Sequence, residues 1–596
     1  MNKSTIILPV KPYDWYKPAP KVLQRVCAEE NPETAWSAWK RHLATRKRPL
    51  AVWSCFDDDD VLFWGGGGVH LDTAICTFLG SAEQGRAPKN SVSGVQEQLD
   101  AWLAMDASRT ISPEERAVST LAWAYLAAWV AEAVSAESWW ELLKRLAQNV
   151  DEASGLALDD HPTTHQLVAG ETALVLAYQF PELMVPRDLG PRGAQAISTG
   201  LVELNDGQGL VHADYFGFHR MLLGCWTRSV LLCRRIKGVK LVSEARTQYE
   251  WAVRSALRMT RSDGTGVFSR VSDAPYFRPL LEASLSAGGN EEDEAIYALL
   301  RGPKRKKRFF DLAPNDTSYY CEWAAAALMR SDWSLESLRL SILFPRENVR
   351  MELEANERVL WSGNWDFEVR RDGTPLKPIS EWVEVCWISD DSGDYLELEV
   401  DLEKDVRLQR AVFLAKEDRF VYLADTILDD SAVESTWDYR GLIPTLDRTI
   451  FEPARESNEG FLKHDRPAAL VLPLALCEWR DDPGRPGFLR DTPQGLAFGR
   501  TVRGTSIVVP LFFDLEVKRM HKPFTWRHLT VAESLEIQPE DRALGWRVRV
   551  GDEQWLIYRS ISNSGNRTVL GHNSSSEFLI ARFDETGEVE PLVEIG

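Results

Sequence analysis

The sequence predicts a two-domain protein of the α+β class, with helices in its first half and an antiparallel β-sandwich in its second. Residues 113 to about 330 carry apolar side chains at helical spacing almost throughout. From about residue 345 the pattern changes to short runs rich in Val, Ile, Trp and Tyr, separated by turn signals. The length of 596 residues exceeds what one hydrophobic core usually serves. Chains that run helices first and strands second form two domains or an α+β architecture.

Amphipathic segments divide the first half into separate helices. We expect them near 113–135, 137–150, 163–179, 192–204, 212–236, 241–259, 276–286 and 293–300, with a further short helix at 317–330. The sequence from Ser112 is typical of a helix N-terminus, because Pro113 takes the first helical position and acidic residues fill the first turn. Paired helices joined by short loops suggest a ring or solenoid, and no fixed-period repeat identifies a particular solenoid.

These patterns divide the chain into three parts. Residues 1–110 form a mixed segment expected to pack on the helical domain, 111–345 form the helical domain, and 346–596 form the sandwich, with the boundary near Pro345. Residues 56–70 have the sequence FDDDDVLFWGGGGVH. This segment lacks the alternating ligands of a calcium loop and the Lys-Ser/Thr pair of a phosphate loop. We interpret it as a solvated turn, with a lid over a cleft as the alternative.

Charge and composition exclude several classes of function. A formal charge of −20 disfavours nucleic-acid binding, which depends on clustered Lys and Arg. Two basic runs exist, at 234–237 and 304–308. No window reaches the roughly 18 to 20 apolar residues that cross a bilayer, and no signal peptide is visible, so we expect a soluble, cytoplasmic protein without a membrane partner. The eight cysteines show no CxxC spacing, which is typical of reduced thiols.

The residues best suited to chemistry lie between Asp159 and Lys237. In a single helix His212, Tyr215 and His219, at positions i, i+3 and i+7, would project from one side. His161 and His165 have the spacing of a metal pair, but Pro162 between them puts the first before the helix. We therefore expect no metal and no other cofactor.

Four segments resemble the heparinase II/III-like polysaccharide lyases. Three of them, at 164–182, 205–218 and 262–273, are similar to the family's Asn-His-Leu helix, its Asp-Gly segment before an active-site Tyr, and its Pro-Asp-Gly loop. The fourth, at 410–425, resembles a strand pair of the same enzymes. The resemblance implies an incomplete α/α toroid followed by a C-terminal antiparallel β-sandwich. It also implies β-elimination at a uronic acid within an anionic oligosaccharide or polysaccharide, such as heparan, alginate or ulvan.

The resemblance implies roles for particular residues. Tyr215 is the first choice for acid/base, and His165 is a partner base or a neutraliser of the substrate carboxylate. His219 would orient Tyr215 or take the proton instead. The candidate substrate contacts are Asn205, His212 and Arg220 from the helical domain and Arg410 from the sandwich edge. A lyase needs such groups because it must remove a weakly acidic proton beside a carboxylate and stabilise the added charge.

Other interpretations remain open. Each candidate can be a structural residue, Tyr215 for example a core ring bonded to the backbone. A glycoside hydrolase would use two carboxylates roughly 5 to 9.5 Å apart, and the candidates are Asp159, Asp160, Glu203, Asp206 and Asp214. A non-catalytic carbohydrate-binding protein is the third interpretation, favoured by Thr164, where the family has Asn. For an enzyme without a visible export signal we expect exolytic action on short oligosaccharides. The oligomeric state is open.

Overall fold

The computed structural model describes residues 20–21, 23, 25, 32–45, 71–83, 94–269, 274–302, 306–431, 433–446, 448–482, 484–562, 565–584 and 587–596. The segment at 56–70 lies outside these residues, as do the end of the 262–273 segment and part of the second basic run. Two compact units make up the chain. The first comprises Met1–Leu257 and Gly264–Glu294, and the second comprises Arg258–Asp263 and Ala295–Gly596.

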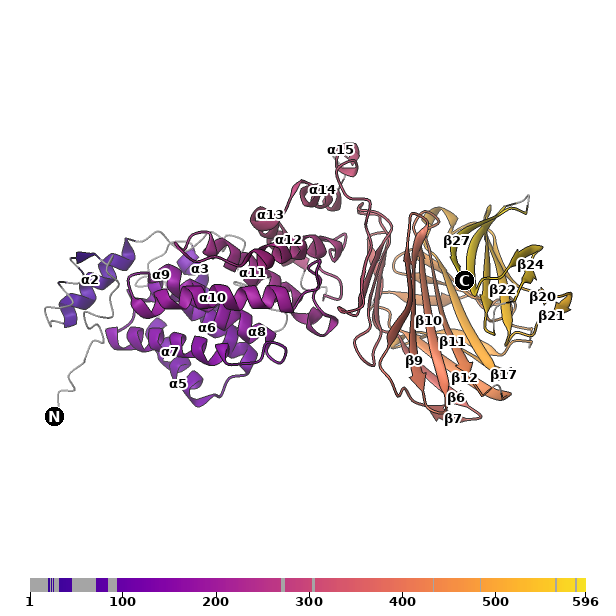
Figure 1. The fold of residues 1–596 in the computed structure, drawn as a ribbon, viewed down its shortest axis with the longest axis horizontal. Helices are drawn as coiled ribbons and strands as arrows, with labels where there is room; N and C mark the ends of the chain where they lie inside the picture. Colours follow the sequence, from indigo (N-terminus) through magenta and orange to yellow (C-terminus); the bar gives the residue numbers. More distant parts are fainter. Residues whose placement is uncertain are drawn as a thin grey trace. The chain divides into compact units, whose positions relative to one another are not determined.

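The first unit is helical (Figure 1). The α-helices of the chain are α2 (Pro32–Ala44), α3 (Thr73–Glu83), α5 (Val95–Ser108), α6 (Pro113–Val130), α7 (Ala136–Ser154), α8 (Pro162–Thr164), α9 (Ala173–Gln179), α10 (Met184–Glu203), α11 (His219–Cys233), α12 (Ser243–Arg258), α13 (Ala274–Gly288), α14 (Glu291–Leu300) and α15 (Lys306–Phe310). The other helices are the π-helix η3 (His165–Thr172) and the 3₁₀-helices η4 (Ala213–Phe218) and η6 (Val517–Arg519). Among the described residues, none of these helices is both long and apolar enough to span a lipid bilayer.

The start of α6 follows the predicted chemistry. The Ser112 side chain accepts from the Glu115 backbone N–H, and the Glu115 side chain accepts from the Ser112 backbone N–H, which forms a complete capping box. Most residues of α6 are buried, so the helix is covered on all sides. A helix that is apolar all round belongs in a core, and α6 accordingly packs against α7 and η3.

The π-helix η3 lies at the centre of the first unit and contacts α6, α7, α10 and α11. Glycines allow the close approach of α10. A Cβ on Gly193 would lie 2.7 Å from the Gly170 carbonyl oxygen, and one on Gly200 would lie 2.1 Å from the Gln166 side chain. Both are closer than real Cβ contacts, so only Gly at these positions lets α10 pack directly on η3.

The second unit is built mainly of antiparallel β-sheets (Figure 1). Its strands are β1 (Tyr319–Cys321), β2 (Ala326–Arg330), β3 (Arg339–Leu343), β4 (Arg350–Ala355), β5 (Arg358–Asn364), β6 (Asp366–Arg371), β7 (Thr374–Leu376), β8 (Val383–Ser389), β9 (Gly393–Leu402), β10 (Val406–Ala415), β11 (Phe420–Asp429), β12 (Ser435–Ile443), β13 (Ile450–Pro453), β14 (Gly460–Lys463), β15 (Pro467–Pro473), β16 (Gly487–Thr492), β17 (Gly495–Gly504), β18 (Ser506–Asp514), β19 (Phe524–Leu529), β20 (Val531–Glu533), β21 (Glu536–Ile537), β22 (Ala543–Val550), β23 (Glu553–Ser560), β24 (Arg567–Val569), β25 (His572–Ser574), β26 (Phe578–Phe583) and β27 (Val589–Ile595).

The sheet with strand order β13-β14-β15-β18-β11-β10-β9-β8 has a hydrophobic core on each face. Alternate residues of β9 enter opposite cores, since Leu396 and Leu398 pack toward β4, β5, β12 and β17 while Tyr395 packs toward β22, β23 and β26. The other sheets have the orders β1-β2-β3-β4-β5, β16-β17-β12-β6-β7, β19-β22-β23-β26-β27 and β21-β20-β24-β25.

The predicted fold class is confirmed: an incomplete α/α toroid is followed by an antiparallel β-sandwich. The helix expected at 317–330 is wrong, because this stretch forms β1 and β2, and β2 is buried along its whole length between β1 and β3. The strands thus begin at Tyr319, before the expected boundary at Pro345. The single helix expected at 212–236 is also wrong in part, since 213–218 form a 3₁₀-helix and the α-helix starts at His219.

Candidate functional site

His165 is the first residue of the π-helix η3. It directly follows α8, whose first residue is Pro162. The His165 backbone N–H donates to the His161 carbonyl over 2.9 Å. Short π-helical insertions often occur at functional sites, because the extra residue per turn displaces the side chains that follow. The His165 ring is partly exposed, and burial lowers its pKa, so it is neutral at pH 7.

Gln166 fixes the tautomer of the His165 ring. The Gln166 Oε1 accepts from the indole N–H of Trp226 over 2.9 Å, and the amide nitrogen donates to the Ala196 carbonyl over 2.9 Å. An indole N–H can only donate and a carbonyl can only accept, so these bonds orient the amide. Its nitrogen also lies 3.1 Å from His165 Nδ1, which therefore accepts. The proton of the neutral ring is on Nε2, and His165 presents an N–H donor on that side.

The segment 205–210 forms a tight loop against α12. Asp206 Oδ1 accepts from the backbone N–H groups of Gln208 and Leu210 over 2.8 and 2.9 Å. Gly209 has φ +75°, and a Cβ there would lie 2.1 Å from the Ala252 backbone nitrogen. Asn205 is 4% exposed, its amide donates to the Leu201 carbonyl, and its Oδ1 is buried with no hydrogen-bond partner among the residues described.

Tyr215 lies in the 3₁₀-helix η4, which His212 caps by accepting the Asp214 N–H on Nδ1 over 3.1 Å. The ring centroids of His212 and Tyr215 are 5.9 Å apart. The Tyr215 hydroxyl donates to Asp159 Oδ1 over 3.4 Å. Burial and the carboxylates of Asp159, Asp214 and Asp160 raise the pKa of Tyr215, so the phenol stays protonated at neutral pH.

His219 begins α11 and is almost fully buried, with 5% of its surface exposed. Its ring stacks on Phe216 at a centroid distance of 6.2 Å, and its Nε2 has no hydrogen-bond partner within the described part of the chain. Burial lowers the pKa of His219 to about 4. The ring is therefore neutral and shielded from solvent. Arg220, the next residue of α11, is partly exposed.

A buried ion pair joins η3 to α11 and α6. Arg228 donates from Nε and Nη2 to the two carboxylate oxygens of Glu171 over 2.5 and 2.8 Å, and the Tyr125 hydroxyl donates to Glu171 Oε1 over 2.7 Å. All three side chains are buried. This network fixes the helices that carry His165 and His219 relative to each other, which is what a preorganised site needs.

Arg410 is the one candidate in the second unit, and it has no exposed surface. Its Nε and Nη2 donate to Asp425 over 2.9 and 2.8 Å, and its Nη1 donates to the Trp365 carbonyl over 2.9 Å. The guanidinium also lies 3.8 Å from the Trp365 ring centroid. Through these contacts the Arg410 guanidinium links β10 to β11 inside the sandwich.

The structure thus brings together some of the site residues predicted from the sequence. Tyr215 of η4 lies beside His212, which caps this helix, and Tyr215 contacts the turn that leads into the helix of His165. Sequence reasoning assigned no role to Gln166, although it follows His165 directly and precedes the apolar run Leu167–Ala169. No group of three or more His, Cys, Asp or Glu side chains within the described residues has the geometry to hold a metal ion.

Comparison with solved structures identifies the class of fold. The chain has the fold of the heparinase III type, in which a helical toroid precedes a β-sandwich. A heparinase III described as the BT4657 gene product superimposes with a TM-score of 0.60 at 10% sequence identity, over 92% of this chain and 98% of that chain. Another heparinase III structure gives a TM-score of 0.59 at 10% identity, over 92% of this chain and all of that one.

A third similar structure is a mutant of the heparan sulfate lyase HepC from Pedobacter heparinus. Its TM-score is 0.55 at 10% identity, and the alignment covers 93% of this chain and 100% of that chain. Neither a sequence-family model nor a curated protein sequence matches the chain. At this identity the likeness is one of fold.

Proposed function

We propose that this chain is a polysaccharide or oligosaccharide lyase that cleaves uronic-acid-containing anionic glycans by β-elimination. The hydrogen bond between Tyr215 and Asp159 carries the proposal, because it holds a protonated phenol beside the turn that leads into the helix of His165. The fold supports the same class of reaction, since the similar structures include heparinase III and a heparan sulfate lyase.

In this proposal His165 stabilises the substrate carboxylate. Removal of the C5 proton puts further negative charge on an anionic group, and a positioned N–H donor is worth more in the transition state than in the ground state. The Gln166 contact leaves the His165 Nε2–H as such a donor. A role as base is less suitable, because the Nδ1 lone pair is already occupied.

Tyr215 and Asp159 act together as the acid–base pair. The C5–H bond breaks and its proton passes to the Tyr215 oxygen, while the phenolic proton moves along the hydrogen bond to Asp159. The C4–O bond then breaks as the C4–C5 double bond forms. The proton held by Asp159 returns through Tyr215 to the leaving oxygen, so the enzyme is regenerated.

The other candidates have supporting roles. Asn205, His212 and Arg220 remain proposed substrate contacts, of which His212 and Arg220 are partly exposed. His219 is a proposed positioning residue, because its buried ring stacks on Phe216 of η4 and it cannot touch a sugar. We leave Arg410 out of the site, because its donors are committed to Asp425 and the Trp365 carbonyl.

A screen of acidic oligosaccharides and polysaccharides for a rise in ultraviolet absorbance tests the proposal, since elimination leaves an unsaturated uronate. We expect turnover of a uronate-containing glycan by the wild type and a loss of at least about a hundredfold in Tyr215→Phe, in line with general acid–base catalysis. His165→Ala should also lose activity. The matched controls are Tyr178→Phe on α9 and His572→Ala on β25, which should keep it. Full activity of Tyr215→Phe would contradict the assignment.

The mode of cleavage is a separate prediction. Exolytic action on short anionic oligosaccharides should release small unsaturated products from the first minutes of the reaction. Size-exclusion profiles over time measure this directly. Steady accumulation of mid-length fragments from a long polymer would contradict the exolytic mode without affecting the assignment of Tyr215.

One observation favours a glycoside hydrolase as the second candidate. Asp159, Asp160 and Asp214 all act on the pKa of Tyr215, so carboxylates gather around this hydroxyl. A hydrolase uses two such groups as acid and as base or nucleophile. Turnover without an ultraviolet product, abolished in Asp159→Asn and retained in Tyr215→Phe, would favour the hydrolase. Binding of an acidic glycan without turnover in any variant would favour a non-catalytic carbohydrate-binding protein.

A further inference from the structure

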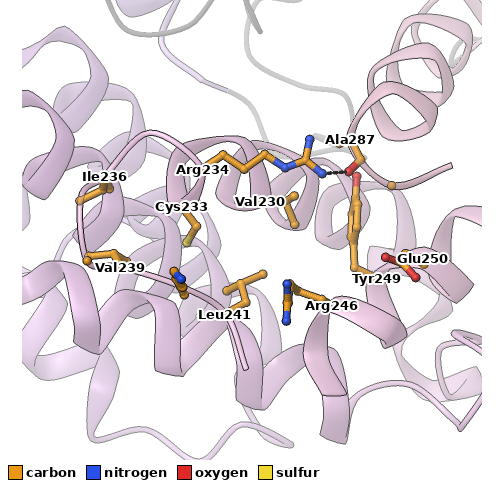
Figure 2. A pocket seen from close by; sticks show the side chains of 13 residues that line it. Val230, Cys233, Arg234, Ile236, Val239, Leu241, Arg246, Tyr249, Glu250 and Ala287 are labelled. Carbon is orange, nitrogen blue, oxygen red and sulfur yellow. Dashed lines mark hydrogen bonds between the residues drawn. The ribbon is translucent and has the colours of Figure 1, made fainter. Parts of the chain in front are cut away.

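A pocket lies at the end of α11 opposite to His219. It is half open and is lined by the last turn of α11, the segment 234–241, the first turns of α12 and the end of α13 (Figure 2). The 15 residues of α11 separate it from the start of that helix by about 21 Å. Its volume is about 410 Å³. This is within the range of small-molecule sites, roughly 300–1,000 Å³.

The walls of the pocket are apolar and closely packed. Val230, Val239 and Leu241 line it and are 5–7% exposed. The ring of Tyr249 forms a further wall, and its hydroxyl donates to Thr227 Oγ1 over 2.9 Å. A Cβ on Gly288 would lie 2.6 Å from that ring, so glycine allows the end of α13 to close against Tyr249.

The rim of the pocket carries three cations and one carboxylate. Arg234, Lys240 and Arg246 line it, together with Glu250, on a chain whose net charge is −20. Arg234 donates to the Ala287 carbonyl, as Figure 2 shows, which directs its guanidinium along the pocket. Arg246 and Leu241 lie beside each other on the opposite wall in the same view.

These cations differ from other arginines of the helical unit. Arg116, Arg228 and Arg254 each form an ion pair with a carboxylate. In the part of the chain that the structure describes, no carboxylate oxygen lies within 4.0 Å of a charged nitrogen of Arg234, Lys240 or Arg246. Like charges gathered around one apolar pocket repel each other, and an anion placed between them would remove that repulsion.

We propose that this pocket binds a small organic anion, a molecule of the size of a mono- or disaccharide that carries a carboxylate, sulfate or phosphate group. The oxyanion contacts Arg234, Lys240 and Arg246, and the body of the molecule lies against Val239, Leu241 and Tyr249. The ligand can be a uronate released from a glycan or a phosphorylated sugar, which present the same oxyanion chemistry. The proposal does not depend on catalysis at Tyr215.

Isothermal titration of the full chain at low salt tests this binding without any turnover. The probes are glucuronate, glucose 6-phosphate, inorganic sulfate and, as the neutral control, glucose. We expect at least one of the two organic anions to bind and glucose not to bind. Glucuronate alone would identify a uronate as the ligand, glucose 6-phosphate alone a phosphorylated sugar, and equal binding a general oxyanion site.

Variants localise the binding. Arg246→Gln and Lys240→Gln should each weaken binding by about tenfold or more, since each removes a charge-assisted contact. Arg235→Gln is the matched control, because Arg235 belongs to the same basic run and does not line the pocket. Glu250→Gln should tighten binding several-fold by removing the opposing charge.

Three results would overturn the proposal. The first is that neither organic anion binds. The second is that glucose or inorganic sulfate binds as tightly as the organic anions, which would remove the charge requirement or the role of the apolar wall. The third is that Arg235→Gln weakens binding as much as Arg246→Gln. Circular dichroism of each variant shows whether the fold is retained.

Discussion

Replacing Gln166 with Met removes the hydrogen bonds that fix the His165 ring and keeps a side chain of similar length. Gln166 has no exposed surface, and a Cβ on Gly200 would lie 2.1 Å from its side chain, so the site has little room to rearrange. The change leaves the indole N–H of Trp226 without its acceptor and the Ala196 carbonyl without one of its donors.

The cost of Gln166→Met can be estimated from these contacts. A buried donor left unsatisfied costs about 1–3 kcal/mol, and the second hydrogen bond contributes about 0.5–1.5 kcal/mol. We therefore expect the free energy of unfolding to fall by about 1.5–4.5 kcal/mol. Urea unfolding followed by the far-ultraviolet circular dichroism of the helices measures it. The control is Gln195→Met on the exposed face of α10, where the amide donates to Thr199. It should change stability by less than about 0.5 kcal/mol.

The same variant tests the tautomer of His165. Selective nitrogen-15 labelling of histidine should show the wild-type ring as neutral with its proton on Nε2 at pH 7, and a mixture of tautomers in Gln166→Met. A wild-type ring protonated on Nδ1, or a stability loss no larger than that of Gln195→Met, would refute the reasoning about Gln166.

Two further predictions concern the buried side chains of His219 and Arg410. His219 has a pKa of about 4 in the folded chain and about 6.5 in the unfolded chain, so the unfolded chain binds the proton first. The free energy of unfolding therefore falls as the pH drops from about 6.5 toward 4, by about 3 kcal/mol in total. His219→Gln should lack this component in unfolding curves measured across that range, and identical pH profiles for the two proteins would contradict it. Arg410→Met leaves the buried Asp425 without its ion-pair partner and should destabilise the sandwich by about 3–5 kcal/mol. Its turnover per folded molecule should equal that of the wild type, and a specific loss of turnover would return Arg410 to the site.

Much of the fold follows from local sequence patterns. The capping box at Ser112 and Glu115 and the helical spacing after it predict α6 and the helices that follow. Leu396, Leu398, Val400 and Leu402 alternate with polar residues along β9, which predicts a strand with one face in a core. The helix wrongly expected at 317–330 contains four consecutive alanines, Ala324–Ala327, which favour helix. Pairing of β2 with β1 and β3 overrides that preference.

The site depends on features that local patterns do not carry. The spacing of His212, Tyr215 and His219 fits an α-helix, but the His212 cap tightens 213–218 into a 3₁₀-helix, so His219 enters the core while Tyr215 stays near the surface. A π-helix at His165 has no simple sequence signal. Arg410 and Asp425 are direct cross-strand partners, which becomes visible only once the register of β10 and β11 is known.

The most direct test of the proposed elimination is a mass spectrum of the products formed in heavy-oxygen water. Elimination adds no water, so we expect unsaturated fragments that absorb in the ultraviolet and carry no heavy oxygen, formed by the wild type and lost in Tyr215→Phe. Saturated fragments with one heavy oxygen atom at each reducing end formed by cleavage would contradict the lyase and identify a hydrolase.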